Sequence, residues 1–381
     1  MKESANCREY LKRLREDSGK EEQSFTKISE YLEKKAREKG TPIRGQFELT
    51  PLCNLNCRMC YVHLSKDQLH GRPLLTVNEW KNLILQAWKA GMFQATLTGG
   101  ECLTYPGFEE IFLYLHSLGC EVDVMTNGLL LDDRWISFFR KHQPASIQIT
   151  LYGSNDDVYE RVTGYRVFHQ VIENVRRVQE AELPLLLSIT PSKFLGEDAL
   201  ETLRIAYSMS NRVFINSMLF KPQMETGRSE EDAEADLDLY TRIFRLSAEM
   251  RGRKTAEFYD GDLPNPGGPY HEYNKKGVKC GGGRSGFVIN WKGEMLPCNR
   301  LDMLRGYPLR EGFETAWARV HGEAEDWPRV PECEGCPYEM ICSHCAANML
   351  QFADPGQFPA KLCERTMYFV RQGVWELPDC E

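Results

Sequence analysis

The feature that most constrains this fold is a regular alternation of short apolar segments with amphipathic ones. Six short segments are expected to be strands, at 46–49, 94–100, 121–128, 146–153, 184–190 and 212–219. The segments between them place apolar residues at helical spacing, at 75–91, 108–119, 131–142, 168–181 and 198–210. Strands separated by helical crossovers pair in parallel, so we expect an α/β protein built on a partial (β/α)6 barrel similar to a TIM barrel. Ligands of such units bind at the carboxyl ends of the strands.

The alternation stops near residue 220, and this change suggests how the chain is divided. We expect a helical N-terminal extension over 1–44, the barrel over 45–225, a helical linker over 226–275 and a small cysteine-rich domain over 276–381. From Cys280 onward the chain shows little helical or strand periodicity. A segment of this kind needs metal to hold it together, because its own hydrophobic core is too small.

Composition excludes several classes of protein. With 42% hydrophobic and 27% charged residues among 381, the chain can bury a sizeable core. A net charge of −8 argues against a protein that coats nucleic acid. The N-terminus lacks the apolar core of a signal peptide, and no stretch is long and apolar enough to span a membrane. We therefore expect a cytoplasmic protein with neither a nucleic-acid nor a membrane partner, whose 14 cysteines are metal ligands, catalytic thiols or buried small residues.

Three cysteines lie on the loop directly after the first expected strand. Cys53, Cys57 and Cys60 have the spacing C-x3-C-x2-C, which lets three thiolates face one metal centre. A [4Fe–4S] cluster takes four ligands, so three cysteines leave one iron open for a small molecule. A zinc site is the alternative, with His63 as a candidate fourth ligand, but no second cysteine pair lies nearby.

These residues resemble the radical S-adenosylmethionine (SAM) superfamily, whose signature is C-x3-C-x-Φ-C with Met59 here at Φ. Further matches follow the next three strands, as Thr-Gly-Gly-Glu at 98–101, Met-Thr-Asn-Gly at 125–128 and Thr-Leu-Tyr-Gly at 150–153. The resemblance implies that SAM is bound by Gly99, Gly100, Glu101, Thr126, Asn127, Thr150 and Arg161. It also implies that a reduced [4Fe–4S] cluster cleaves SAM to methionine and a 5′-deoxyadenosyl radical, which abstracts hydrogen from the substrate.

A second cysteine cluster lies in the last third of the chain. Cys280 and Cys298 lie near the ends of an expected β-hairpin. Five more follow, at Cys333, Cys336, Cys342, Cys345 and Cys363. The segment resembles the SPASM domain of radical SAM enzymes, which binds auxiliary [4Fe–4S] clusters. Two residues separate Cys342 from Cys345 here, whereas the SPASM pattern has three.

The SPASM resemblance implies two auxiliary [4Fe–4S] clusters. In the family's interleaved arrangement, Cys333, Cys336, Cys342 and Cys363 hold the distal one, and Cys280, Cys298 and Cys345 hold the nearer one. The nearer cluster then has an open iron, for which Asp302 and His344 are candidate ligands. Two structural zinc sites are the alternative for this domain.

Four cysteines remain outside these groups. Cys102 directly follows the Gly-Gly-Glu segment, which makes it a candidate catalytic thiol, with packing as the alternative. Cys120 is expected to be buried in a helix-to-strand turn. Nothing assigns Cys7 or Cys380 a role.

The resemblance implies a radical SAM/SPASM maturase that installs a thioether or carbon–carbon crosslink in a ribosomally synthesised peptide. The alternatives are a sulfatase-maturating enzyme that forms formylglycine, a tetrapyrrole-modifying enzyme, and, in another class, an iron–sulfur redox sensor or scaffold. The implied partners are a peptide or protein substrate and flavodoxin or ferredoxin as electron donor. The N-terminal extension is short for a leader-binding module, so either a separate protein presents the peptide or no leader is used.

Overall fold

One sheet runs through the structure, a computed structural model that describes residues 22–219, 233–253, 277–338, 341–342 and 345–375. Its strands are β1 (Arg44–Glu48), β2 (Gln94–Thr98), β3 (Glu121–Thr126), β4 (Ser146–Leu151), β5 (Leu185–Ile189), β6 (Val213–Ile215), β7 (Gly286–Ile289) and β8 (Met295–Leu296). Their order is β6-β5-β4-β3-β2-β1-β7-β8, and only the β7–β8 pair among them is antiparallel. The predicted parallel α/β barrel with six strands is therefore confirmed.

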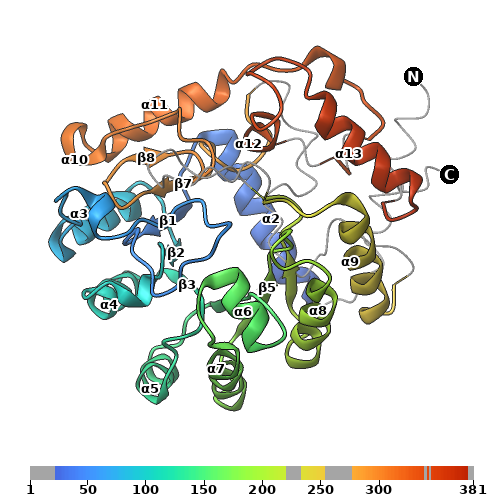
Figure 1. The fold of residues 1–381 in the computed structure, drawn as a ribbon. Helices are drawn as coiled ribbons and strands as arrows, with labels where there is room; N and C mark the ends of the chain where they lie inside the picture. Colours follow the sequence, from blue (N-terminus) through green and yellow to red (C-terminus); the bar gives the residue numbers. More distant parts are fainter. Residues whose placement is uncertain (1–21, 220–232, 254–276, 339–340, 343–344, 376–381) are drawn as a thin grey trace.

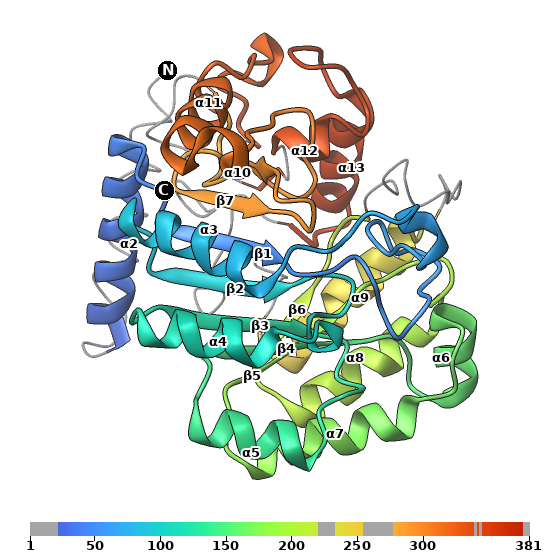
Figure 2. The ribbon, with the colours of Figure 1, turned by 90° about the vertical axis from the view of Figure 1, so that its left-hand side faces the viewer.

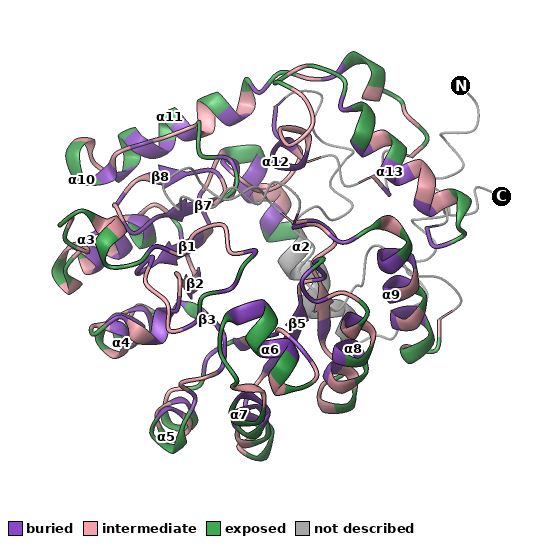
Figure 3. Cartoon of the chain, viewed as in Figure 1, coloured by how far each residue is buried: buried purple, intermediate pink, exposed green. Residues whose placement is uncertain are grey.

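Helices surround the curved sheet on its outer side (Figure 1). They are α3 (Val77–Lys89), α4 (Phe108–Ser117), α5 (Asp133–Lys141), α6 (Asp156–Thr163), α7 (Phe168–Glu180), α8 (Asp198–Met209) and α9 (Leu237–Met250). All the crossover helices expected between strands are confirmed. The strands are largely buried, whereas the outward faces of the helices are exposed (Figure 3).

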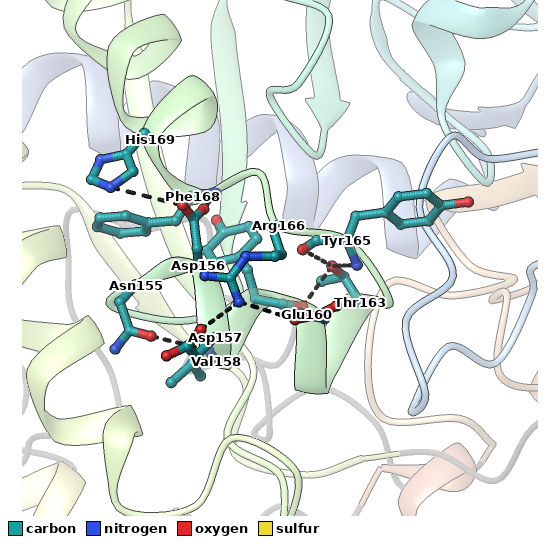
Figure 4. Close-up of polar contacts among 11 residues, drawn as sticks. Asn155, Asp156, Asp157, Val158, Glu160, Thr163, Tyr165, Arg166, Phe168 and His169 are labelled. Atoms are coloured by element: carbon teal, nitrogen blue, oxygen red, sulfur yellow. Dashed lines mark hydrogen bonds and ion pairs between the residues drawn. The ribbon is translucent and has the colours of Figure 1, made fainter.

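The short helix α6 was not predicted, because its eight residues are mostly polar and hydrogen bonds at both ends define it. The Asn155 side chain accepts a hydrogen bond from the Val158 N–H at 3.1 Å, which caps the first turn. Gly164 ends the helix with φ of 81°. Beyond it, Arg166 forms ion pairs with Asp157 and Glu160 (Figure 4).

The α2 helix (Glu22–Lys39) lies at the end of the barrel where the strands begin (Figure 2). Its Glu33 carboxylate is buried and accepts hydrogen bonds from Arg37 Nε at 3.0 Å and Ser285 Oγ at 2.5 Å. Arg44 Nη2 of β1 lies 2.9 Å from the same carboxylate. The helix ends before Gly40, whose φ is 63°. These contacts hold α2 against the end of the barrel where the strands begin.

Regular structure in the C-terminal third exceeds what the sequence predicted. The expectation of little periodicity beyond Cys280 is wrong for α11 (Phe313–Glu325) and α13 (Ala360–Arg371), which each bury one face. The short helices α10 (Pro308–Glu311) and α12 (Ala346–Met349) accompany them. The predicted hairpin between Cys280 and Cys298 is confirmed as β7–β8.

Strand β7 pairs with β1, so the barrel sheet continues past the boundary expected at residue 276. The proposed domain limits therefore describe segments joined by one sheet. The Pro/Gly-rich part of the expected linker, together with Cys7, His344 and Cys380, lies outside the described residues. No helix that the structure describes is long and apolar enough to cross a membrane.

A capping box formed by Thr76 and Glu79 begins α3. The Thr76 hydroxyl accepts a hydrogen bond from Glu79 N at 3.3 Å, and Glu79 Oε2 accepts one from Thr76 N at 2.7 Å. Thr76→Ala should lower the free energy of unfolding by about 1 kcal/mol, because it leaves a helical N–H unpaired. Urea denaturation measures this loss. Thr76→Ser keeps the cap and should retain most of the stability; an equal loss in both variants would contradict the capping account.

Candidate active site

The three cysteines of the loop after β1 gather around one tyrosine. Burial raises the pKa of the Tyr152 phenol, and the thiols of Cys57, Cys60 and Cys53 raise that pKa further. Cys57 is buried, and the other two cysteines are partly exposed. The loop is also joined to α6, because Asn56 N donates to the Thr163 carbonyl at 2.9 Å. The loop that carries the three thiols therefore lies against α6 at the carboxyl end of the barrel.

The surroundings of these thiols suit an iron–sulfur cluster. Cys53 Sγ accepts hydrogen bonds from Leu55 N at 3.4 Å and Asn127 Nδ2 at 3.6 Å, and Cys60 Sγ accepts one from His63 N at 3.4 Å. Such N–H···S bonds stabilise ligating thiolates and tune the potential of a cluster. Burial raises the pKa of Cys53 to about 12, so ionisation of this thiol requires nearby positive charge, which iron supplies.

Within the described residues, no three His, Cys, Asp or Glu side chains converge on the position of a single ion. A [4Fe–4S] cluster does not require this convergence, since its ligands are spread over several iron atoms. His63 contributes its backbone N–H to the Cys60 sulfur. The donor set therefore fits the cluster that the spacing predicted.

Two glycines allow the end of β2 to lie directly against the chain that leads into the cysteine loop. Gly100 N donates to the Thr50 carbonyl at 2.6 Å, and Glu101 N donates to the Leu52 carbonyl at 2.9 Å. A Cβ atom on Gly99 would lie 2.4 Å from Thr50 O, and one on Gly100 would lie 2.4 Å from Leu52 O. Both distances are too short for any side chain, so this approach requires glycine at both positions.

Glu101 joins the ends of β2 and β3 from a buried position. Its Oε1 atom accepts hydrogen bonds from Thr126 Oγ1 at 2.8 Å and Leu103 N at 3.1 Å, and its Oε2 atom accepts one from Asn127 N at 2.8 Å. Burial raises the pKa of this carboxyl, while the three hydrogen bonds favour its charged form. Asn127 also donates to Asn54 Oδ1 at 2.7 Å. One network thus joins Cys53, Glu101, Thr126 and Asn127.

Thr150 and Arg161 make contacts further around the barrel. The Thr150 hydroxyl lies 2.8 Å from the Ser188 hydroxyl, which links β4 to β5. Arg161 Nε donates to the Phe194 carbonyl at 2.8 Å, and Nη2 donates to the Leu195 carbonyl at 3.3 Å. The Arg161 guanidinium is therefore hydrogen-bonded to the loop after β5. Its contact with a SAM carboxylate stays a prediction.

The candidate thiol Cys102 is fully buried. Its Sγ atom donates to the Met125 carbonyl at 3.2 Å, and burial raises the pKa of the thiol well above its usual value. This arrangement is that of a packed, protonated side chain, and a catalytic role for Cys102 stays a prediction. Cys120 is buried as expected, and burial raises its pKa to about 11.

Comparison with known proteins decides the family. Residues 47–222 match the radical SAM superfamily, and this segment contains the cysteine triad and the carboxyl ends of the first six strands. Residues 47–222 of this chain are therefore a radical SAM domain.

Relatives and solved structures resemble most of the chain. The AdoMet-dependent heme synthase of Methanosarcina barkeri is 25% identical over 79% of this chain and 90% of its own length. The PqqA peptide cyclase of Bradyrhizobium diazoefficiens is 25% identical over 79% of this chain and 80% of its own. Streptococcus suis SuiB bound to its precursor peptide SuiA superposes with a TM-score of 0.65 at 16% identity, covering 88% of this chain and 79% of that one. This superposition shows a shared fold.

The C-terminal cysteines of this radical SAM protein fall into two groups. Burial raises the pKa of Cys345 to about 12, and Cys280 and Cys298 add to the rise. Backbone N–H groups of Gly282 and Asn348 donate to the sulfurs of Cys280 and Cys345, each at 3.4 Å. Cys280 and Cys298 are therefore near enough to Cys345 to affect its ionisation.

The other four cysteines form the second group. Burial raises the pKa of Cys342 to about 11, and Cys333, Cys363 and Cys336 raise it further. The Thr366 hydroxyl donates to Cys342 Sγ at 3.2 Å. The assignment of these seven cysteines to two clusters, which the SPASM resemblance implies, stays a prediction. Asp302, a candidate ligand, instead lies 3.5 Å from Arg305 Nη2 and is mostly exposed.

One buried carboxylate near the radical SAM triad was not singled out by the sequence. Glu48 ends β1, is 6% exposed, and has no hydrogen bond or ion pair with the residues that the structure describes. Burial raises the pKa of the Glu48 carboxyl to about 7, although the nearby charge of Lys292 lowers that pKa in part. The sequence does contain a signal for this residue, because it is acidic and lies in a short strand just before the cysteine loop. The sequence does not show whether its side chain points into the barrel, since that depends on the register of the sheet.

Proposed function

We propose that this radical SAM enzyme modifies a peptide or protein side chain, most specifically by installing a thioether or carbon–carbon crosslink in a ribosomally synthesised peptide. The main observation in support is that one hydrogen-bond network joins Cys53, Asn127 and Glu101 at the mouth of a radical SAM barrel. The similarity to a peptide cyclase, and in fold to an enzyme bound to a precursor peptide, supports a peptide substrate. When bound, the reduced cluster and SAM supply a 5′-deoxyadenosyl radical that removes a hydrogen atom from carbon.

The proposed roles of the residues follow from their places. Cys53, Cys57 and Cys60 hold the [4Fe–4S] cluster that binds SAM. The proposed SAM contacts are Gly99, Gly100, Glu101, Thr126, Asn127, Thr150 and Arg161. The Glu101 carboxylate, just after β2, already accepts hydrogen bonds from the end of β3. We therefore propose that it positions the SAM site.

Two auxiliary [4Fe–4S] clusters complete the proposal. Cys280, Cys298 and Cys345 would hold the nearer cluster, and Cys333, Cys336, Cys342 and Cys363 the distal one. The proposed electron donor is flavodoxin or ferredoxin, and the proposed compartment is the cytoplasm, where thiols stay reduced. A separate leader-binding protein would present the peptide if a leader is used.

A tetrapyrrole substrate is the second candidate, favoured by the similarity to the heme synthase over 90% of that protein's length. The formylglycine-forming activity is a further alternative, whereas the similarity to a peptide cyclase does not favour the sensor role. Each of these roles predicts a different outcome from the same preparation, so one experiment separates them.

The experiment uses enzyme reconstituted without oxygen, reduced with dithionite and supplied with SAM. Peptides encoded beside the gene are compared with an iron tetrapyrrole, and mass spectrometry follows 5′-deoxyadenosine and the substrate mass. Loss of two hydrogen atoms from a peptide, with a new crosslink in its fragments, supports the proposal. A modified tetrapyrrole or an aldehyde on the peptide supports the corresponding enzyme alternative, and SAM binding without any cleavage supports the sensor.

A further inference from the structure

The carboxylate of Glu48 faces the inside of the barrel. On the same strand, the Phe47 ring packs edge-on against Trp80 of α3 at 6.1 Å, so Phe47 faces the surrounding helices. Successive side chains of a strand point to opposite faces, and Glu48 therefore points to the interior. Its register partner on β2 is Thr98, the last residue before the Gly-Gly-Glu segment. Glu48 thus lies at the carboxyl end of the strands, at the level of the proposed SAM site.

Glu48 lies near residues of both segments that carry the proposed clusters, Tyr61 and Cys298. Its charge raises the pKa of Tyr61, which follows Cys60, and that of Cys298, after burial as the main cause in both. Tyr61 Oη accepts a hydrogen bond from Asn299 Nδ2 at 2.5 Å, which joins the radical SAM loop to the segment that carries Cys298. A substrate in the barrel mouth would therefore meet this carboxylate at the carboxyl end of β1.

The proposed crosslinking requires a proton acceptor at such a position. Once a hydrogen atom has been removed from one substrate carbon, that carbon bonds to the sulfur or carbon of a second side chain, whose own bond to hydrogen breaks. This second step releases one electron and one proton. An iron–sulfur cluster is the class of acceptor for the electron, and the proton needs a base within hydrogen-bond reach.

We propose that Glu48 is the base that accepts this proton, a role that rests on the proposed function. Its carboxylate is nine-tenths buried and has no partner among the described side chains, so both oxygens are free for a substrate hydrogen. A structural carboxylate in this setting would be paired, as Glu33 and Glu101 are. The charged and titratable groups facing it are Lys292 from the β7–β8 turn, Tyr61 from the cysteine loop, and Cys298.

The raised pKa of Glu48, about 7, supports this role, because a base works best when its pKa lies near the working pH. Burial favours the neutral acid, so the carboxylate form that accepts a proton becomes populated only as the pH rises through about 7. Crosslink formation should therefore rise over this pH range in the wild-type enzyme.

The test is Glu48→Gln in the full-length reconstituted enzyme, with a peptide that the wild type modifies. We expect 5′-deoxyadenosine formation within about threefold of wild type and crosslink formation lowered about 10²- to 10⁴-fold, the usual contribution of a general base. Glu48→Asp should recover part of the product. Asp123→Asn is the matched control, since Asp123 faces the same interior from β3 but is hydrogen-bonded to Ser146 at 2.5 Å; it should keep the wild-type ratio.

A second readout needs no substrate. Infrared titration of the reconstituted enzyme should show a protonated carboxyl band that disappears as the pH rises through about 7 or above, is absent from Glu48→Gln and remains in Asp123→Asn. The proposal is overturned if this band is missing in the wild type, if Glu48→Gln crosslinks at the wild-type rate, or if both products fall in parallel. A wild-type enzyme that modifies no peptide would instead contradict the proposed function, while the band still reports on Glu48.

Discussion

Cys57→Ala should lower 5′-deoxyadenosine formation more than about 100-fold, to the background of reductant and SAM alone. Changes to groups that merely support a metal ligand typically cost 10- to 100-fold, and removal of a ligand should cost more. Cys57 is the buried member of the triad beside Tyr152, so no water or neighbouring side chain readily replaces it. The measurement is mass spectrometry of the anaerobic reaction, together with the iron and sulfide content of the protein.

Cys120→Ala is the matched control for this result. It makes the same chemical change at a buried thiol, in the turn between α4 and β3. We expect it to keep its iron content and its 5′-deoxyadenosine formation within about twofold, since a small buried thiol contributes mainly packing. Wild-type SAM cleavage in Cys57→Ala would contradict the ligand role of the triad.

Gly100→Ala should be the most damaging single-methyl substitution near the site. The new Cβ would lie 2.4 Å from Leu52 O and 2.6 Å from Pro51 O, and neither backbone carbonyl can move without shifting the cysteine loop. We expect the free energy of unfolding to fall by about 3 kcal/mol, the upper range for overpacking. Because the loop carries Cys53, the iron content after reconstitution should fall as well.

Gly322→Ala provides the control for the glycine substitution. Gly322 lies within α11, and a Cβ there meets nothing within 4 Å. Alanine should raise the free energy of unfolding by about 0.5–1 kcal/mol, because it favours the helix over the unfolded chain. Urea denaturation of both variants tests the pair. Equal stability of Gly100→Ala and the wild type would contradict the close approach of β2 to the cysteine loop.

The spacing of apolar residues predicted the barrel well, because this spacing is regular in both its strands and its helices and differs between them. α3 has both an apolar face and a capping box, and its limits lie within two residues of those expected at 75–91. α6 was missed because Asn155 and Gly164 define it more than any apolar face does. In α11 the helical periodicity is present in the sequence itself, and Phe313, Ala316, Trp317 and Val320 form its buried face.

The sequence predicted those parts of the candidate site that are short local motifs. The cysteine triad and the glycines at 99–100 are local motifs, so spacing alone places them at strand ends. Glu48 was missed because its role depends on which face of β1 points inward, and only the sheet register sets that direction. The attachment of Arg161 to the loop after β5 likewise joins residues 33 and 34 positions apart.

The most direct test of the central claim follows one hydrogen atom. The reconstituted enzyme is supplied with SAM, reductant and deuterated peptides encoded beside its gene, and the mass of 5′-deoxyadenosine is measured. The account predicts that one deuterium moves from the peptide into 5′-deoxyadenosine as the peptide is crosslinked. Formation of 5′-deoxyadenosine without deuterium while the peptide stays unmodified would contradict a peptide-modifying radical enzyme.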